Sequence, residues 1–201
     1  NMGFMSDMPQ LPVVKTGAAI FFGYVAEIAR VVIIAGAIVF LVRFFLIQPF
    51  SVRGASMEPN FYDHEYLIID ALSYRMREPE RGEIVVFRYP NDPRQFFIKR
   101  VIGLPGETGV VKGGQVFVQK AGDAEPQLLD EYAYLGTVPT PGDKRVVLGT
   151  NDFFMMGDNR PSSLDSRSFG PVTKNQITGR VWLRGLPIDK ITSFDTPSYS
   201  E

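Results

Sequence analysis

The sequence predicts a mainly β protein: an antiparallel β-sheet domain preceded by one N-terminal transmembrane helix. An apolar run near the N-terminus is long enough to cross a bilayer. After residue 50, short runs of β-branched and aromatic residues alternate with turn residues. Nineteen glycines and fifteen prolines interrupt the chain too often for a helical bundle. We therefore expect a tail at 1–17, an anchor at 18–49, and a β-domain at 50–201 with a small insert at about 106–150.

The apolar segment covers residues 28–47, IARVVIIAGAIVFLVRFFLI. At about 1.5 Å per residue, a helix of this length spans roughly 30 Å of hydrocarbon. Its charged residues, Arg30 and Arg43, lie near the ends, where long side chains reach the interface. Pro49 is expected to end the helix. Large residues follow the apolar core, whereas a cleavable signal peptide has small ones, so we interpret the segment as an uncleaved anchor. A buried core helix is the alternative.

Charge around the anchor does not predict its orientation. Lys15 and Arg30 precede the span, and Arg43 and Arg53 follow it. Because the basic residues are balanced, the positive-inside rule favours neither side.

Seven runs of the soluble part are predicted to be strands, because turn residues bound each one and many carry apolar side chains on both faces. The stretch 120–143 is richer in Pro, Gly, Asp and Glu and is predicted to be a loop excursion. The predicted strands are 65–70, 83–89, 96–102, 115–119, 144–148, 152–156 and 177–184.

Composition also excludes several classes of function. A net charge of −1 argues against a nucleic-acid partner, since neutralising phosphates requires a basic excess. The absence of cysteine excludes disulfides, thiol catalysis and cysteine-ligated metals. A single histidine leaves little from which to build a zinc site. We expect neither a metal nor another cofactor.

Ser56, within RGASMEP at 53–59, is a candidate nucleophile. A serine hydroxyl needs a neighbour to take its proton, and histidine is the common choice. The one histidine, His64, lies in the polar stretch 60–65, which is typical of a turn. A solvated loop histidine is therefore favoured over a Ser-His-Asp triad.

Lys99 is the alternative base. An exposed lysine has a pKa of about 10.4 and is protonated at neutral pH, but burial lowers this pKa. In a strand, Lys99 shares a face with Phe97 and Val101, which gives it apolar surroundings. Ser-Lys pairs are a known variant of serine catalysis. A solvated lysine at a strand edge is the alternative interpretation.

A third cluster, GDNRPSSLDSRSFGP at 157–171, alternates acids, arginines and serines. It is either a solvated polar loop or a folded loop that charge-assisted hydrogen bonds hold beside an active site.

The order of four motifs behind an apolar anchor resembles type I signal peptidases. Each motif alone is weak, but their combination is specific, and the resemblance spans about residues 28–185. The motifs are GASMEPNF, GEIVVF (82–87), KRVIGLPGE (99–107) and GDNRPSSLDSR (157–167).

The resemblance implies that Ser56 is the nucleophile and Lys99 the general base. Ser163 matches a serine that hydrogen-bonds the lysine and orients its amine. Gly54 stands where some members have a serine that helps bind the oxyanion. Backbone N–H groups of Ser56 and Gly54 are therefore the expected donors. Glu83 stands where aspartate is commoner, a mild departure.

Two acids in the fourth motif match residues that brace the site. Asp158 and Asp165 are expected to pair with Arg100 and Arg167.

For the whole protein, the resemblance implies a membrane-bound serine endopeptidase that removes signal peptides from exported preproteins. Cleavage would follow small residues, Ala-x-Ala, by acyl transfer through a Ser-Lys dyad. Its partners would be preproteins and the lipid bilayer. It would be a single-pass protein of the cytoplasmic membrane, with the catalytic domain on the outer face. A soluble self-cleaving peptidase of the SOS-repressor kind and a tethered peptide-binding module without catalysis are the alternatives.

Overall fold

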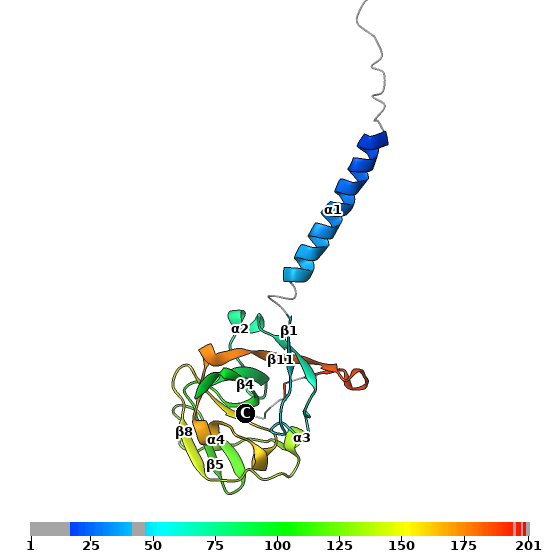
Figure 1. The fold of residues 1–201 in the computed structure, drawn as a ribbon. Coiled ribbons are helices and arrows are strands. Elements are labelled where there is room, and N and C mark those ends of the chain that lie inside the picture. Colours follow the sequence, from blue (N-terminus) through cyan, green and yellow to red (C-terminus); the bar gives the residue numbers. More distant parts are fainter. Residues whose placement is uncertain (1–16, 42–46, 195, 198, 200–201) are drawn as a thin grey trace, which may run out of the picture. The chain divides into compact units, whose positions relative to one another are not determined.

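The computed structural model describes residues 17–41, 47–194, 196–197 and 199 (Figure 1). The chain separates into two compact units, Asn1–Val42 and Arg43–Glu201. Each is described by itself.

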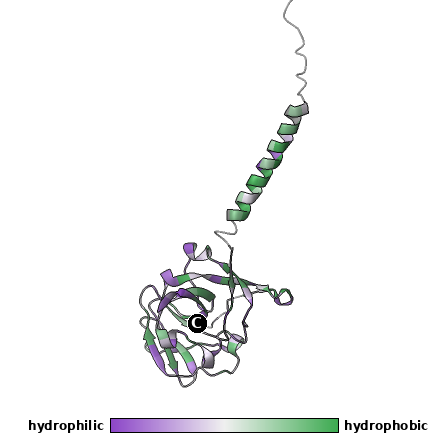
Figure 2. Ribbon diagram, in the orientation of Figure 1, coloured by the Kyte–Doolittle hydropathy of each residue, from purple (hydrophilic) through white to green (hydrophobic). Residues whose placement is uncertain are grey.

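The first unit contains helix α1, Gly17–Leu41, which is largely hydrophobic (Figure 2). Its stretch Phe21–Phe40 has a mean hydropathy of 1.9 and is not buried against other parts of the chain. The helix is therefore long and apolar enough to cross a membrane.

The predicted end of the helix is wrong. The helix ends at Leu41, and Ile47–Ser51 forms strand β1, which pairs with β2 (Tyr66–Asp70). Residues 42–46 of the predicted span lie outside the described residues. The apolar residues before Pro49 suit a strand as well as a helix. Because β1 is at the edge of its sheet, the missing N–H of proline is tolerated there.

The second unit is built from two antiparallel sheets, which confirms the predicted fold class. The larger sheet has the order β1-β2-β11-β3-β4-β9-β10, with β12 paired to β11. Its remaining strands are β3 (Ile84–Tyr89), β4 (Asp92–Gly103), β9 (Asp152–Met156), β10 (Val172–Thr173), β11 (Ile177–Leu186) and β12 (Thr192–Ser193).

The smaller sheet has the order β7-β6-β5-β8 and lies wholly within the predicted insert. Its strands are β5 (Thr108–Lys112), β6 (Gln115–Gln119), β7 (Gln127–Leu128) and β8 (Lys144–Val147).

All seven predicted runs contain a strand, but β5 was missed. Gly109 weakens the strand pattern of this run in the sequence. The structure explains the glycine, because a Cβ at this position would lie 3.0 Å from the ring of Phe154. The glycine lets the smaller sheet approach β9 closely.

Short helical turns connect the strands. The excursion at 120–143 is not only loop, since it carries β7 and α3. The turns are α2 (Ser73–Met76), α3 (Tyr132–Leu135), α4 (Ser166–Phe169), η2 (Arg160–Ser162), η3 (Lys174–Gln176) and η4 (Ile188–Lys190).

The larger sheet is strongly curved. Strands β2, β11 and β3 stand between β1 and β4 in the hydrogen-bonding order. Nevertheless, the rings of Phe50 on β1 and Phe96 on β4 have centroids only 5.3 Å apart. The curvature thus brings the edge strand β1 to face β4, and a core that includes Val52, Leu67 and Val86 fills the space between the strands.

Candidate active site

Two side chains that are 43 positions apart meet in the second unit. Ser56 lies in the turn that follows β1, and Lys99 projects from β4, where it pairs with Val85. The Lys99 Nζ lies 2.7 Å from the Ser56 Oγ. This distance is within reach of direct proton transfer between the two groups.

Lys99 is kept away from water. The residue is 3% exposed, its Nζ donates to the Ile98 carbonyl at 2.8 Å, and its Nζ lies 5.4 Å from the centroid of the Phe97 ring. Burial lowers the pKa of Lys99 to about 8, while the charges of Asp165 and Asp158 act in the opposite direction. A substantial fraction of the amine is therefore neutral near pH 8.

The loop after β9 holds the turn at Ser56 in place. Asn159 donates its backbone N–H to the Ser56 carbonyl at 3.0 Å, and its side-chain Nδ2 donates to the Ala55 carbonyl, also at 3.0 Å. Sequence reasoning did not single out Asn159, because its motif gives no sign of which carbonyls it would reach.

Gly157 permits this close approach. A Cβ at Gly157 would overlap both the Ser56 carbonyl oxygen and the Ser163 Oγ. Only glycine can therefore occupy this position beside Ser56 without displacing one of these groups.

Two buried ion pairs fix the ends of this loop. Arg100 donates twice to Asp158, with distances of 2.8 and 2.7 Å. Arg167 donates to Asp165 at 2.9 and 2.8 Å, and Asp165 also accepts the Gly157 N–H at 3.2 Å. The β4–β9 register places Arg100 opposite Met156, so Asp158 follows two residues later within reach. The pairings have the partners that the resemblance implies.

Sequence reasoning also missed Asn60. Its Nδ2 donates to Asp158 Oδ2 at 2.8 Å and to the Tyr134 carbonyl at 3.0 Å. Asn60 lies in the turn just after Ser56, and it connects this turn to the Arg100–Asp158 pair.

Comparison with known proteins assigns a family to this arrangement. Residues 25–185 match the family described as signal peptidase, peptidase S26. The chain belongs to the signal peptidase family. It is accordingly a serine endopeptidase.

Relatives of this family resemble the chain along most of its length. A signal peptidase I of Bacillus amyloliquefaciens is 35% identical over 179 residues, 83% of this chain and 91% of that protein. A probable signal peptidase I-2 of Synechocystis sp. is 34% identical over 171 residues, 82% of this chain and 75% of that protein. A signal peptidase IB of Staphylococcus aureus is 31% identical over 169 residues, 78% of this chain and 87% of that protein.

Among solved structures, the chain is similar to a signal peptidase I from Enterococcus faecalis V583. The identity is 27% and the TM-score is 0.42, covering 52% of this chain and 97% of that chain. The fold described above rests on the strand pairing of this chain and not on that likeness.

Two details of this signal peptidase differ from expectation. Among the described residues, the buried Ser163 Oγ has no hydrogen-bond partner, so the expected bond to Lys99 is absent. The Gly54 N–H, an expected oxyanion donor, already donates to Asp63 Oδ1 at 2.9 Å. In the structure, the Gly54 N–H therefore already has an acceptor, the Asp63 carboxylate.

The histidine of this signal peptidase is a solvated turn residue, as predicted. The His64 side chain is 88% exposed, and its Nδ1 lies 2.7 Å from Asp63 Oδ2. Its backbone has φ 65°, in the left-handed region typical of turns. Lys99, not His64, contacts the serine hydroxyl.

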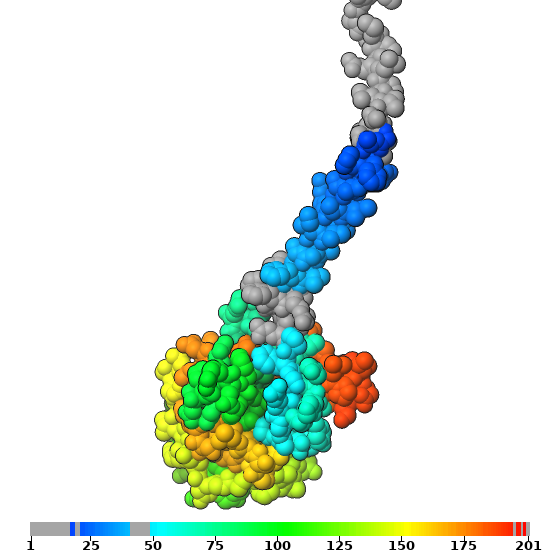
Figure 3. All heavy atoms as spheres, viewed as in Figure 1, coloured from blue at the N-terminus to red at the C-terminus, as the bar shows by residue number. Residues whose placement is uncertain are grey.

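A groove of about 760 Å³ leads along β1 and β4 to Ser56 and Lys99. In Figure 3, the cyan surface near residue 50 adjoins the green surface near residue 95 on this side of the domain. No cluster of three potential metal-ligating side chains occurs among the described residues. The apolar residues that line the groove include Phe50, Val52, Leu67, Val86, Phe96, Ile98 and Leu164.

Proposed function

We propose that the protein cleaves signal peptides from exported preproteins after small residues, Ala-x-Ala, by acyl transfer through a dyad of Ser56 and Lys99. One observation carries this proposal. A lysine amine that is almost fully buried lies 2.7 Å from a serine hydroxyl, and the only histidine is in a solvated turn.

The neutral amine of Lys99 supplies the base that serine needs. It accepts the Oγ proton of Ser56 while Oγ attacks the scissile carbonyl. The resulting ammonium then donates this proton to the departing amine. In the second half of the cycle, the amine takes a proton from water, which attacks the acyl carbon. The ammonium then donates a proton to the Ser56 Oγ as its bond to the acyl group breaks.

The negative oxygen of the tetrahedral intermediate needs hydrogen-bond donors. We assign this role to the backbone N–H of Ser56. The Gly54 N–H can take part only after its bond to Asp63 has been exchanged. We therefore rank it as a second donor that becomes free if the turn at Asp63 shifts.

Ser163 is assigned to orient the amine of Lys99 during this cycle. Its buried hydroxyl, without a partner among the described residues, is available when the amine changes its protonation state. A buried hydroxyl that has no hydrogen bond is costly, which favours a partner acquired during catalysis.

The groove accounts for the class of substrate. Strand β1 ends the sheet, so an extended peptide can lie along it by strand addition. Apolar side chains line the groove. Such a surface accepts small apolar side chains at alternate positions of a strand, which is the pattern of Ala-x-Ala.

Helix α1 supports attachment to a bilayer. Its apolar stretch is long enough to cross a membrane once. We propose a single-pass protein of the cytoplasmic membrane with the catalytic domain on the outer face, where the cleavage sites of exported proteins emerge. Tethering enzyme and substrate to one surface raises their effective concentration.

The test is cleavage of a preprotein and of an Ala-x-Ala peptide by purified full-length protein in detergent. Ser56→Ala and Lys99→Ala should each abolish cleavage, while His64→Ala should keep the wild-type rate. A Lys99→Ala variant with full activity, or a His64→Ala variant without any activity, would contradict the proposed dyad of Ser56 and Lys99.

A further inference from the structure

Glu131 connects the polar excursion at 120–143 to the loop that holds the nucleophile. Its carboxylate accepts from both terminal nitrogens of Arg160, with Oε2 2.7 Å from Nη1 and Oε1 2.5 Å from Nη2. The Arg160 side chain is 0% exposed and that of Glu131 is 10% exposed. Because charges this deeply buried require a partner, the ion pair firmly joins the two segments.

Arg160 in turn is linked to Ser56 through a short path. The Arg160 Nε donates to the Gly157 carbonyl at 3.0 Å. The preceding residue, Asn159, makes the two hydrogen bonds to the Ala55 and Ser56 carbonyls. A shift of the Arg160 guanidinium would therefore move the groups that fix the position of the nucleophile.

Tyr134, in helix α3, adds a second connection from the same excursion. Its hydroxyl donates to Glu131 Oε1 at 2.7 Å. Its ring lies 4.0 Å from the Arg100 guanidinium carbon, and Arg100 is the partner of Asp158. The excursion thus contacts Arg160 within the loop and also Arg100, which holds Asp158 at the start of the loop.

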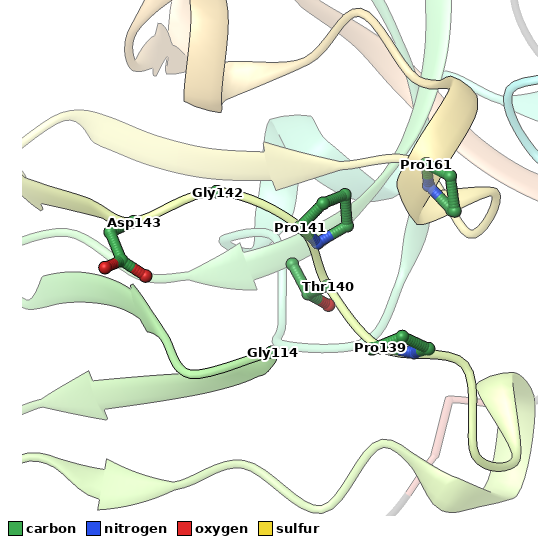
Figure 4. A pocket seen from close by; sticks show the side chains of 7 residues that line it. All are labelled: Gly114, Pro139, Thr140, Pro141, Gly142, Asp143 and Pro161. Atoms are coloured by element: carbon green, nitrogen blue, oxygen red, sulfur yellow. The ribbon is translucent and has the colours of Figure 1, made fainter.

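The contact lies outside the substrate groove. Thr140 accepts from the Arg160 Nη1 at 2.7 Å. Figure 4 shows Thr140 in a hollow that Pro139–Asp143 and Pro161 line together. This hollow shares no lining residue with the groove along β1 and β4. Neither Glu131 nor Arg160 lines the groove, so a change at Glu131 reaches the groove only through the loop and turn around Ser56.

We propose that Glu131 is a positioning residue for the cleavage reaction, which acts through Arg160 on the placement of Ser56. The inference rests on the proposed function. It assigns a role in catalysis to a segment that carries none of the four sequence motifs.

The first test is Glu131→Gln in the full-length protein, with kcat and KM measured on an Ala-x-Ala peptide. The amide keeps the size of the side chain but loses the charge that pairs with Arg160. We expect kcat to fall by about 10- to 100-fold, because small misplacements of a nucleophile are costly. KM should stay within about twofold, since neither Glu131 nor Arg160 lines the groove along β1 and β4.

Glu125→Gln is the matched control. Glu125 is an exposed residue of the same excursion. The same chemical change there should leave both kcat and KM at wild-type values.

A second variant separates positioning from stability. Replacing the pair by Glu131→Leu and Arg160→Met removes both buried charges, and such apolar replacements often preserve stability. The double variant should unfold at a temperature near that of the wild type and still show a reduced kcat. Wild-type kcat in this variant or in Glu131→Gln would overturn the inference.

Failure of the proposed function has a different signature. In that case the wild-type protein does not cleave the peptide, or Ser56→Ala cleaves it at the same rate, whatever the Glu131 variants do.

Discussion

The Lys99 amine lies 2.7 Å from the Ser56 hydroxyl, and Lys99 is only 3% exposed. The same burial that brings the two groups together lowers the pKa of the amine to about 8. The apolar surroundings of β4 thus determine both the position and the pKa of the Lys99 amine.

The pH profile of cleavage follows from this pKa. Below about pH 8, Lys99 is mostly protonated and cannot accept the serine proton. We expect kcat/KM to rise about tenfold per pH unit below this value and to level off above it. Measurement of initial rates between pH 5 and about pH 10 checks the profile. A profile without an inflection between about pH 7 and 9 contradicts the role of Lys99.

Replacing Lys99 with methionine should stabilise the fold while abolishing activity. The pKa of Lys99 is lowered from 10.5 to about 8, so the unfolded state binds more protons between these values. The free-energy cost of burying the protonated amine is complete below about pH 8 and disappears above about pH 10.5. The pKa difference corresponds to about 3 kcal/mol, and lost hydrogen bonds reduce the expected gain to about 1–3 kcal/mol.

Urea unfolding at pH 7 and pH 10 measures this effect. The gain of Lys99→Met over wild type should be larger at pH 7 than at pH 10. An equal gain at both values would mean that the amine titrates alike in the folded and unfolded states.

Gly157→Ala should severely impair the enzyme. The added methyl group overlaps the Ser56 carbonyl and the Ser163 hydroxyl, so the nucleophile must shift. We expect kcat to fall by about 10²-fold or more. Gly185→Ala is the control, because the nearest atoms there lie at 3.8 Å, an ordinary contact distance. If both alanine variants cleave equally well, the close approach at Gly157 is unimportant.

Asp63 distinguishes the two candidate oxyanion donors. Asp63→Ala removes the acceptor of the Gly54 N–H, whereas Asp63→Asn retains one. With the Ser56 N–H as donor, the alanine variant should lose about three- to tenfold in kcat through a looser turn, and asparagine should restore it. An increased kcat in Asp63→Ala would instead show that the freed Gly54 N–H stabilises the oxyanion.

The sequence predicted much of this architecture because its signals are local. Turn residues bound each predicted strand, and the motif order placed Ser56 and Lys99 in one family of enzymes. The pairing of Arg100 with Asp158 was implied by the resemblance. The strands could be predicted from residues within a few neighbours, whereas the site depended on the order of the four motifs along the chain.

Features that depend on distant partners could not be predicted. Strand β1 was assigned to the helix because its apolar residues suit either structure, and only pairing with β2 decides between them. Glu131 looked like any solvated acid in a polar loop. Its role becomes visible only when the fold places Arg160 beside it.

Since β1 is the edge strand beside the groove, main-chain hydrogen bonds can supply much of the binding energy of an extended peptide. Such bonds depend on the backbone conformation of the bound peptide and not on its side chains. An enzyme built in this way can accept many precursors of unrelated sequence. The most disruptive single change in such a substrate is a proline at a position whose N–H should donate to the edge strand β1.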